Sequence, residues 1–124
     1  MKITILFLSI LITQVPAARA ESILASMYGL EACEFNPHRK CPTASGKSLY
    51  ELERKKVPYC ASFEYPIGAE LELTNSRGVS ARCVVLDRGP HPRLKQKLDL
   101  SRRVFTRLGR EADGRIKIQV RRVK

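Results

Sequence analysis

The sequence lacks several features that would place it in a familiar class of protein. Its 124 residues contain no internal repeat, no low-complexity tract and no second domain. The apolar run from Ile3 to Ile12 falls short of the roughly 20 residues that a transmembrane helix needs. Acidic residues are scarce, with 12 Asp and Glu against 23 Lys and Arg. These absences exclude a repeat architecture and a membrane-spanning helix, and they leave one small, basic domain.

The N-terminus has the pattern of a secretory signal peptide. Lys2 precedes the apolar run, and Ala18-Arg19-Ala20 is a small-residue cleavage site. Cleavage after Ala20 divides the chain into a signal peptide at 1–20 and a mature domain at 21–124. No cysteine lies near this site, so nothing indicates a lipid anchor. We therefore expect a periplasmic or secreted monomer with no stable membrane anchor.

The excess of positive charge indicates anionic partners. Removing Lys2 and Arg19 with the signal peptide reduces the 23 basic residues to 21 against 12 acidic ones, a net charge near +9. Such a charge attracts polyanions. Because export argues against nucleic acid, we expect the partner to be a cell-wall carboxylate, a teichoic acid or an outer-membrane phosphate.

The mature chain contains four cysteines: Cys33, Cys41, Cys60 and Cys83. An even number in an exported chain favours two disulfide bonds over free thiols, and three pairings are possible. We favour Cys33–Cys41, which closes a short loop, with Cys60–Cys83, which ties the segment before one strand to the middle of the next. The alternative, a zinc site that includes His38, lacks a nearby fourth ligand. We expect no metal and no cofactor.

Hydropathy patterns predict several elements of secondary structure. A helix is predicted to begin after Ser101 or Asp99 as its N-cap and to end at Gly109. Asp99 is therefore interpreted as a structural cap. One or two helical turns are predicted over 49–56, after a long loop at 31–48 that is rich in Pro, Asn and Ser. Four strands with alternating apolar side chains are predicted at 22–28, 69–74, 79–86 and 115–120.

Asp87 stands at the end of the predicted strand 79–86 and precedes Arg88-Gly89-Pro90. Gly permits unusual backbone angles and Pro removes a hydrogen-bond donor, so the chain must leave the sheet here. A carboxylate at a strand end, beside a fixed turn and an arginine, is a candidate for acid–base chemistry. The alternative is that Asp87 caps its own turn while Arg88 forms a surface ion pair. These residues alone leave both interpretations open.

Five short motifs together resemble one protein family. In chain order they are ASMYG at 25–29, TASG at 43–46, YPIG at 65–68, VVLDRGP at 84–90 and LDLSRRVFTRLG at 98–109. They resemble the rare lipoprotein A (RlpA)-like double-psi β-barrels, and they extend over nearly the whole mature chain. The resemblance implies an all-β fold, a single six-stranded double-psi β-barrel with one short helix, stapled by disulfides. The same fold also serves expansin-like and purely binding proteins.

The resemblance implies a lytic transglycosylase that cleaves the glycan strands of peptidoglycan without water and leaves a 1,6-anhydro end. Asp87 matches the acid/base residue of the family. One carboxyl group can protonate the leaving oxygen and then accept the proton of the sugar's 6-hydroxyl. We expect the substrate-binding residues to surround it: Tyr28, Lys47, Ser62, Glu64 and Arg88.

Two positions depart from the family's pattern. Lys47 follows the glycine of TASG, where the family commonly has Glu, and Ser62 stands where the family has His. Glu64 and the more distant Glu51 are the candidate replacement acids. The departures favour an alternative function, an expansin-like module that binds or loosens wall polysaccharide without cutting it. A third hypothesis is a small disulfide-rich inhibitor or effector.

Other side chains are candidates for contacts with a glycan. His91 and the basic residues near Asp87 can contact anionic substituents, and His91 does so more strongly below about pH 6.5. Sugar rings stack on aromatic faces, and the candidates for such a platform are Tyr28, Tyr50, Tyr59, Phe63 and Tyr65.

Overall fold

Alternating side chains build the strands of a barrel. The structure is a computed structural model that describes residues 2–5 and 20–124. In β3 (Glu70–Thr74), Leu71 and Leu73 are fully buried, while the Glu side chains between them stay partly exposed. The other strands are β1 (Glu21–Tyr28), β2 (Tyr59–Ala61), β4 (Ser80–Asp87), β5 (Leu98–Ser101) and β6 (Ile116–Arg122). The four strands predicted from the sequence are confirmed to within two residues at each end.

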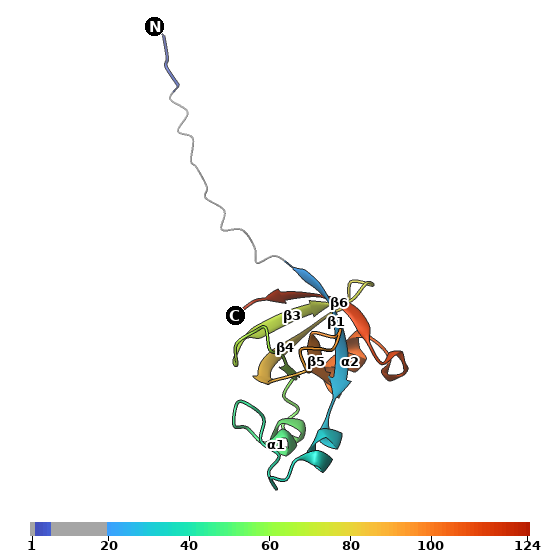
Figure 1. Ribbon diagram of the computed structural model, residues 1–124. Helices are drawn as coiled ribbons and strands as arrows, with labels where there is room; N and C mark the ends of the chain where they lie inside the picture. Colours follow the sequence, from blue (N-terminus) through green and yellow to red (C-terminus); the bar gives the residue numbers. More distant parts are fainter. Residues whose placement is uncertain (1, 6–19) are drawn as a thin grey trace.

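The six strands close into a barrel in the order β1-β5-β2-β4-β3-β6 (Figure 1). β1 pairs with β5, and β2 with β4, in parallel, and the other neighbours are antiparallel. β3 and β4 form a hairpin, but β1 and β2 pair with strands that lie far away in the sequence. The closed mixed sheet is a double-psi β-barrel, and the predicted fold class is confirmed.

The barrel interior holds the main hydrophobic core. The Cys60–Cys83 disulfide bond lies within it, with 5.9 Å between the two Cα atoms. α2 (Arg102–Leu108) covers part of β4, β5 and β1. It contributes three buried side chains to the core: Val104, Phe105 and Leu108. Burial of these groups stabilises the closed barrel, because a fully buried Leu or Phe side chain contributes about 1.5–3 kcal/mol.

A second, smaller core lies outside the barrel. Residues 29–58 cover it, and we call this segment the disulfide lobe. The lobe contains η1 (Leu30–Phe35) and α1 (Leu49–Arg54), and the Cys33–Cys41 disulfide bond closes it. It projects from one side of the barrel (Figure 1). Its apolar side chains pack on residues of β2 and β4: Tyr59, Val84 and Leu86. Both disulfide pairings that we favoured from the sequence are therefore confirmed.

Two local expectations were wrong. The segment 31–48 is not a loop throughout, because its first residues belong to η1. Asp99 does not cap a helix, because it lies in the short strand β5 between Leu98 and Leu100, which are both fully buried in the barrel. Ser101 does occupy the N-cap position of α2, but its side chain makes no capping hydrogen bond.

Most of the expected signal peptide lies outside the described residues, which exclude 1 and 6–19. β1 begins at Glu21, directly after the expected cleavage site. In the part of the chain that the structure describes, none of the helices has the length and apolar character needed to cross a bilayer.

Candidate functional site

One row of paired residues crosses four neighbouring strands and contains two carboxyl groups. We call it the acidic row. The register pairs Ser26 of β1 with Asp99 of β5, Asp99 with Ala61 of β2, and Ala61 with Asp87 of β4. A register shift between Cys60 and Ala61 brings Asp87 opposite the alanine. The two acids therefore flank a single small residue. Since neighbouring strands are about 4.8 Å apart, the Cα atoms of the two acids are separated by about 10 Å.

Asp87 is held by three hydrogen-bond donors. Its Oδ1 accepts from the backbone N–H groups of Ala44 and Arg88, each at 2.9 Å. Its Oδ2 accepts from the hydroxyl of Tyr28 at 3.2 Å. All three partners donate, which is the arrangement that an ionised carboxylate can satisfy. Asp87 is thus fixed in orientation by three parts of the chain: the end of β1, the loop at 43–47 and its own turn.

Asp99 has a different environment. Burial is the main cause that raises the pKa of Asp99 above its ordinary value, and the charges of Glu31 and Asp87 raise it further. The hydroxyl of Ser26 donates to Asp99 Oδ1 at 2.8 Å and partly opposes this rise. Asp99 therefore keeps its proton to a higher pH than an exposed aspartate does. The row combines one carboxyl group surrounded by donors with another that is predisposed to hold a proton.

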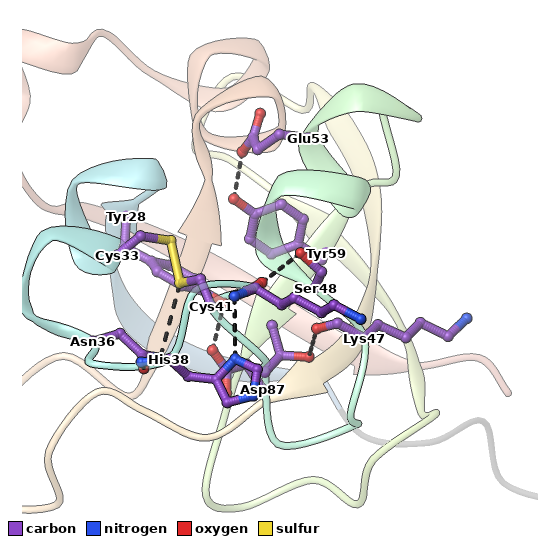
Figure 2. The surroundings of a disulfide bond; sticks show 12 residues. Tyr28, Cys33, Asn36, His38, Cys41, Lys47, Ser48, Glu53, Tyr59 and Asp87 are labelled. Atoms are coloured by element: carbon purple, nitrogen blue, oxygen red, sulfur yellow. Dashed lines mark hydrogen bonds between the residues drawn. A yellow bond between two sulfur atoms is a disulfide. The ribbon is translucent and has the colours of Figure 1, made fainter.

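Tyr28 connects this row to the disulfide lobe. Its ring meets that of Tyr59 edge to face, with 5.5 Å between the ring centroids. The Tyr59 hydroxyl donates in turn to Glu53 of α1 (Figure 2). Burial, reinforced by the charge of Asp87, raises the pKa of Tyr28 far above its usual value. The Tyr28 hydroxyl therefore remains protonated and continues to donate to Asp87.

Two of the expected substrate-binding side chains do not lie in this row. The backbone carbonyl of Lys47 closes the 43–47 turn by accepting from Thr43 N–H at 2.8 Å. The Lys47 side chain is exposed and extends away from that turn (Figure 2). Ser62 is fully buried, and its hydroxyl accepts from the N–H groups of Glu64 and Tyr65. Ser62 thus holds the turn before β3, and a ligand on the surface cannot reach its hydroxyl.

Arg88 also has a structural contact. Its Nη1 donates to the carbonyl oxygens of Ser62 at 2.8 Å and Tyr65 at 2.6 Å, and it forms no ion pair with Asp87 among residues 2–5 and 20–124. Arg88 therefore ties the turn after β4 to the turn before β3. The rest of its side chain is exposed and open to a ligand.

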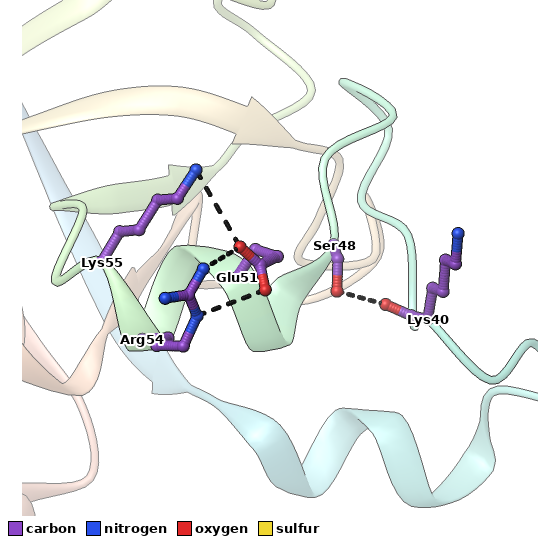
Figure 3. Close-up of polar contacts among 5 residues, drawn as sticks. All are labelled: Lys40, Ser48, Glu51, Arg54 and Lys55. Carbon is purple, nitrogen blue, oxygen red and sulfur yellow. Dashed lines mark hydrogen bonds and ion pairs between the residues drawn. The ribbon is translucent and has the colours of Figure 1, made fainter.

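The two candidate replacement acids differ in their surroundings. Glu64 is exposed on the turn beside Ser62. Glu51 lies on α1 and pairs with Arg54 at 2.6 Å and with Lys55 at 3.9 Å (Figure 3). Its hydrogen bond with Arg54 lowers the pKa of Glu51, so this residue is poorly suited to hold a proton. Of the two, Glu64 is the acid that stays free of ion pairs within the described ranges.

Only some of the aromatic candidates are available for stacking. Tyr59 is fully buried and Tyr65 packs on the main core, whereas Tyr50 and Phe63 are exposed. The zinc alternative is excluded for Cys33 and Cys41, since both sulfur atoms are in a disulfide bond. No group of three or more potential metal ligands occurs among residues 2–5 and 20–124.

Asp99 is the candidate site residue that the sequence interpretation assigned to a helix cap. Its neighbours Leu98 and Leu100 gave one signal, because alternation of apolar, acidic and apolar side chains is the pattern of a strand. The four residues of β5 are too few for that pattern to outweigh the capping preference of Asp and Ser. Its partnership with Asp87 depends on β2, which lies between the two strands.

Comparison with solved structures identifies the architecture. The chain aligns over 86% of its length with a variant of the expansin from Clavibacter michiganensis in complex with cellohexaose, at 23% identity and a TM-score of 0.62. The apo form of that expansin gives 25% identity and a TM-score of 0.62. The fold is an expansin-like double-psi β-barrel. In each case the chain spans 51% of the expansin's length.

A smaller protein has the same architecture over its whole length. The Streptomyces papain inhibitor aligns with 90% of this chain and 100% of its own, at 18% identity and a TM-score of 0.63. No protein-family model and no curated protein matches the sequence. The comparisons therefore give the fold, and the function has to be inferred from the site.

Proposed function

We propose that the row containing Asp87 and Asp99 is the active site of an exported lytic transglycosylase that acts on peptidoglycan. The observation that carries this proposal is the pairing of two carboxyl groups in unlike environments across one small residue. Pairs of this kind divide the roles of proton donor and proton acceptor in many hydrolytic and lytic sites. The motifs that resemble the RlpA-like family, which include both acids, support the same assignment.

The proposed reaction assigns one step to each acid. Asp99, whose pKa is raised by burial, donates its proton to the leaving glycosidic oxygen as the C–O bond breaks. Asp87 accepts the proton of the sugar's 6-hydroxyl as that oxygen bonds to the anomeric carbon and forms the 1,6-anhydro ring. No water is consumed. The Tyr28 hydroxyl, which donates to Asp87 Oδ2 at 3.2 Å, positions this carboxylate.

The connection from β4 to β5 supports an anionic glycan as substrate. This segment, 88–97, joins the two acidic residues in the sequence. It presents five exposed side chains that are basic or become so on protonation: Arg88, His91, Arg93, Lys95 and Lys97. Lactyl and stem-peptide carboxylates make peptidoglycan anionic, and such groups are attracted to a basic strip beside the cleavage site. The two disulfide bonds support an extracytoplasmic location.

A second candidate is a non-cleaving module that binds wall polysaccharide. It is favoured by the exposed position of Lys47 and the burial of Ser62, which leave the row without the polar groups that the family has at these positions. The complex of the Clavibacter michiganensis expansin variant with cellohexaose supports polysaccharide as the ligand class. A third candidate, inhibition of a cysteine protease, rests on the whole-length match to the Streptomyces papain inhibitor.

Digestion of purified peptidoglycan by the oxidised mature protein tests the proposal. The substrate is supplied with and without stem peptides, and soluble products are analysed by mass spectrometry for 1,6-anhydro muramic ends. Their formation is the result that we expect. Sedimentation with insoluble peptidoglycan or cellulose, without any product, would instead support the binding module. Inhibition of papain without product or sedimentation would support the third candidate.

A further inference from the structure

A pocket of about 610 Å³ is lined by strands other than the two that carry Asp87 and Asp99. Its strands are β1, β6 and β3, which are consecutive in the closed sheet, whereas Asp99, Ala61 and Asp87 lie on β5, β2 and β4. The β3–β4 hairpin, the end of α2 and η2 (Glu111–Asp113) complete its walls. Its volume falls within the range of about 300–1,000 Å³ that is typical of ligand sites.

Four cations line this pocket: Arg77, Arg110, Arg115 and Lys117. Asp113 is the one carboxylate among the lining residues, and it is already occupied by Arg110. Asp113 Oδ2 accepts from the backbone N–H of Arg110 at 3.0 Å, and Oδ1 pairs with Nη2 of the same residue at 3.2 Å. The other three cations form no ion pair with any residue in 2–5 or 20–124.

The walls of the pocket are held by specific contacts. Asn75 Nδ2 donates to the carbonyl of Leu108 at 2.9 Å and so ties the hairpin to the end of α2. Asn75 Oδ1 accepts from the N–H groups of Arg77 and Val79, each at 2.9 Å, which fixes the hairpin itself. Asn75 is buried. The pocket is therefore a preformed hollow, which lowers the entropic cost of binding.

The lining gives the chemical class of the ligand. Three guanidinium groups and one ammonium group suit oxyanions, since the planar fork of Arg matches both phosphate and carboxylate geometry. Hydroxyl and amide groups from Ser22, Thr74 and Gln119 can bond to alcohols, and Leu108 and Ile118 offer apolar surface. Among residues 2–5 and 20–124, no aromatic ring lines the pocket, so these residues offer no face on which a sugar can stack.

We propose that this pocket binds an anionic polyol polymer, a chain of hydroxyl-bearing units that carry phosphate or carboxylate groups. The pocket is separate from the acidic row, so binding there holds the protein on an anionic polymer while the row stays free to meet another strand. The binding does not depend on catalysis by Asp87. Phosphate and carboxylate polymers share this chemistry, and the experiment distinguishes them.

The test compares two triple variants of the mature protein with equal loss of charge. The pocket variant carries Arg77→Gln, Arg115→Gln and Lys117→Gln. The control variant carries Arg39→Gln, Arg103→Gln and Lys124→Gln, at exposed positions outside the pocket. Binding of poly(glycerol phosphate), polygalacturonate and neutral dextran is measured by calorimetry at low and at physiological salt. Amide chemical shifts of the wild-type protein locate the bound polymer.

We expect wild-type protein to bind at least one of the two anionic polymers, with shifts at 74–77 and 108–119, and to ignore dextran. The polymer that binds identifies the oxyanion. The pocket variant should show a Kd raised roughly tenfold, and the control variant a Kd raised by no more than about twofold. Equal weakening in both variants, shifts centred on 87–99, or no binding of either anionic polymer would overturn the proposal. The amide chemical shifts of the wild-type protein locate the binding site even if the pocket variant fails to fold.

Discussion

Removal of the Cys33–Cys41 bond tests whether the disulfide lobe is stabilised apart from the barrel. The bond joins residues separated by 8 positions, and the loop-entropy model gives about 2.5 kcal/mol for a loop of this length. The Cys60–Cys83 bond joins residues separated by 23 positions, for which the same model gives about 3.4 kcal/mol. The second pair also lies in the barrel core, so its removal adds the cost of a cavity.

The assay is denaturant unfolding of Cys33→Ala/Cys41→Ala and of Cys60→Ala/Cys83→Ala, each compared with the oxidised wild-type protein. We expect the first variant to lose about 2.5 kcal/mol of unfolding free energy and the second to lose more than about 3.4 kcal/mol. Limited proteolysis gives a second measurement. Cleavage within 29–48 should become faster in the first variant, because the lobe is then held only by its apolar packing on β2 and β4 and by a few hydrogen bonds to these strands.

Two results would refute this reasoning. A loss below about 1 kcal/mol in the Cys33→Ala/Cys41→Ala variant would mean that the lobe remains ordered without its bond. A larger loss in that variant than in Cys60→Ala/Cys83→Ala would mean that the lobe, and not the barrel interior, limits the stability of the fold.

Three further substitutions have defined outcomes. Gly109→Ala places a Cβ atom 2.8 Å from Ile116 Cγ2. This overpacking should lower the free energy of unfolding by about 1–3 kcal/mol in a denaturant titration. An unchanged free energy of unfolding would mean that β6 shifts freely. Asn75→Ala removes three hydrogen bonds and should cost about 2–3 kcal/mol in the same assay, with a loss near zero counting against the role of Asn75. Asp99→Asn should flatten the pH dependence of stability. The folded pKa of Asp99 is raised, so its contribution is complete below the unfolded pKa and is lost as pH rises through the folded pKa. The wild-type Tm should therefore fall relative to that of the variant as the pH rises above about 4, and a constant difference would contradict a raised pKa of Asp99.

The sequence contains enough local information to predict most of the barrel. The apolar alternation of Leu71 and Leu73 marks β3, and the VVLDRGP motif marks both the end of β4 and the turn after it. The disulfide pairing that we favoured among three possibilities, on loop length and on the position of each cysteine relative to its strand, is the one in the structure. The alternation in β3 and the turn after β4 depend on neighbouring residues, which a local pattern expresses directly.

The acidic row was harder to predict, because it depends on pairings between distant segments. Asp99 and Asp87 are neighbours because each pairs with Ala61 of β2, which lies between their strands. β2 has only three residues. No local pattern shows that such a short segment is a central strand. The burial of Ser62 was not predicted for a similar reason. Ser62 lies in the turn before β3, and Arg88, at the end of β4, donates a hydrogen bond to its carbonyl oxygen. Pairing between remote strands, parallel for β2 with β4 and antiparallel for β2 with β5, is therefore the part of the candidate site that the sequence did not show.

Asp87 and Asp99 together form the proposed glycan-cleaving site. Its direct test is the rate of 1,6-anhydro product release from peptidoglycan by the wild-type protein and by single carboxyl-to-amide variants. Asp87→Asn and Asp99→Asn should each lower the rate by about a hundredfold or more while the proteins stay folded. Glu34→Gln, at an exposed position on η1 outside the row, should leave the rate unchanged. Full activity in either aspartate variant would show that its carboxyl group takes no part in cleavage.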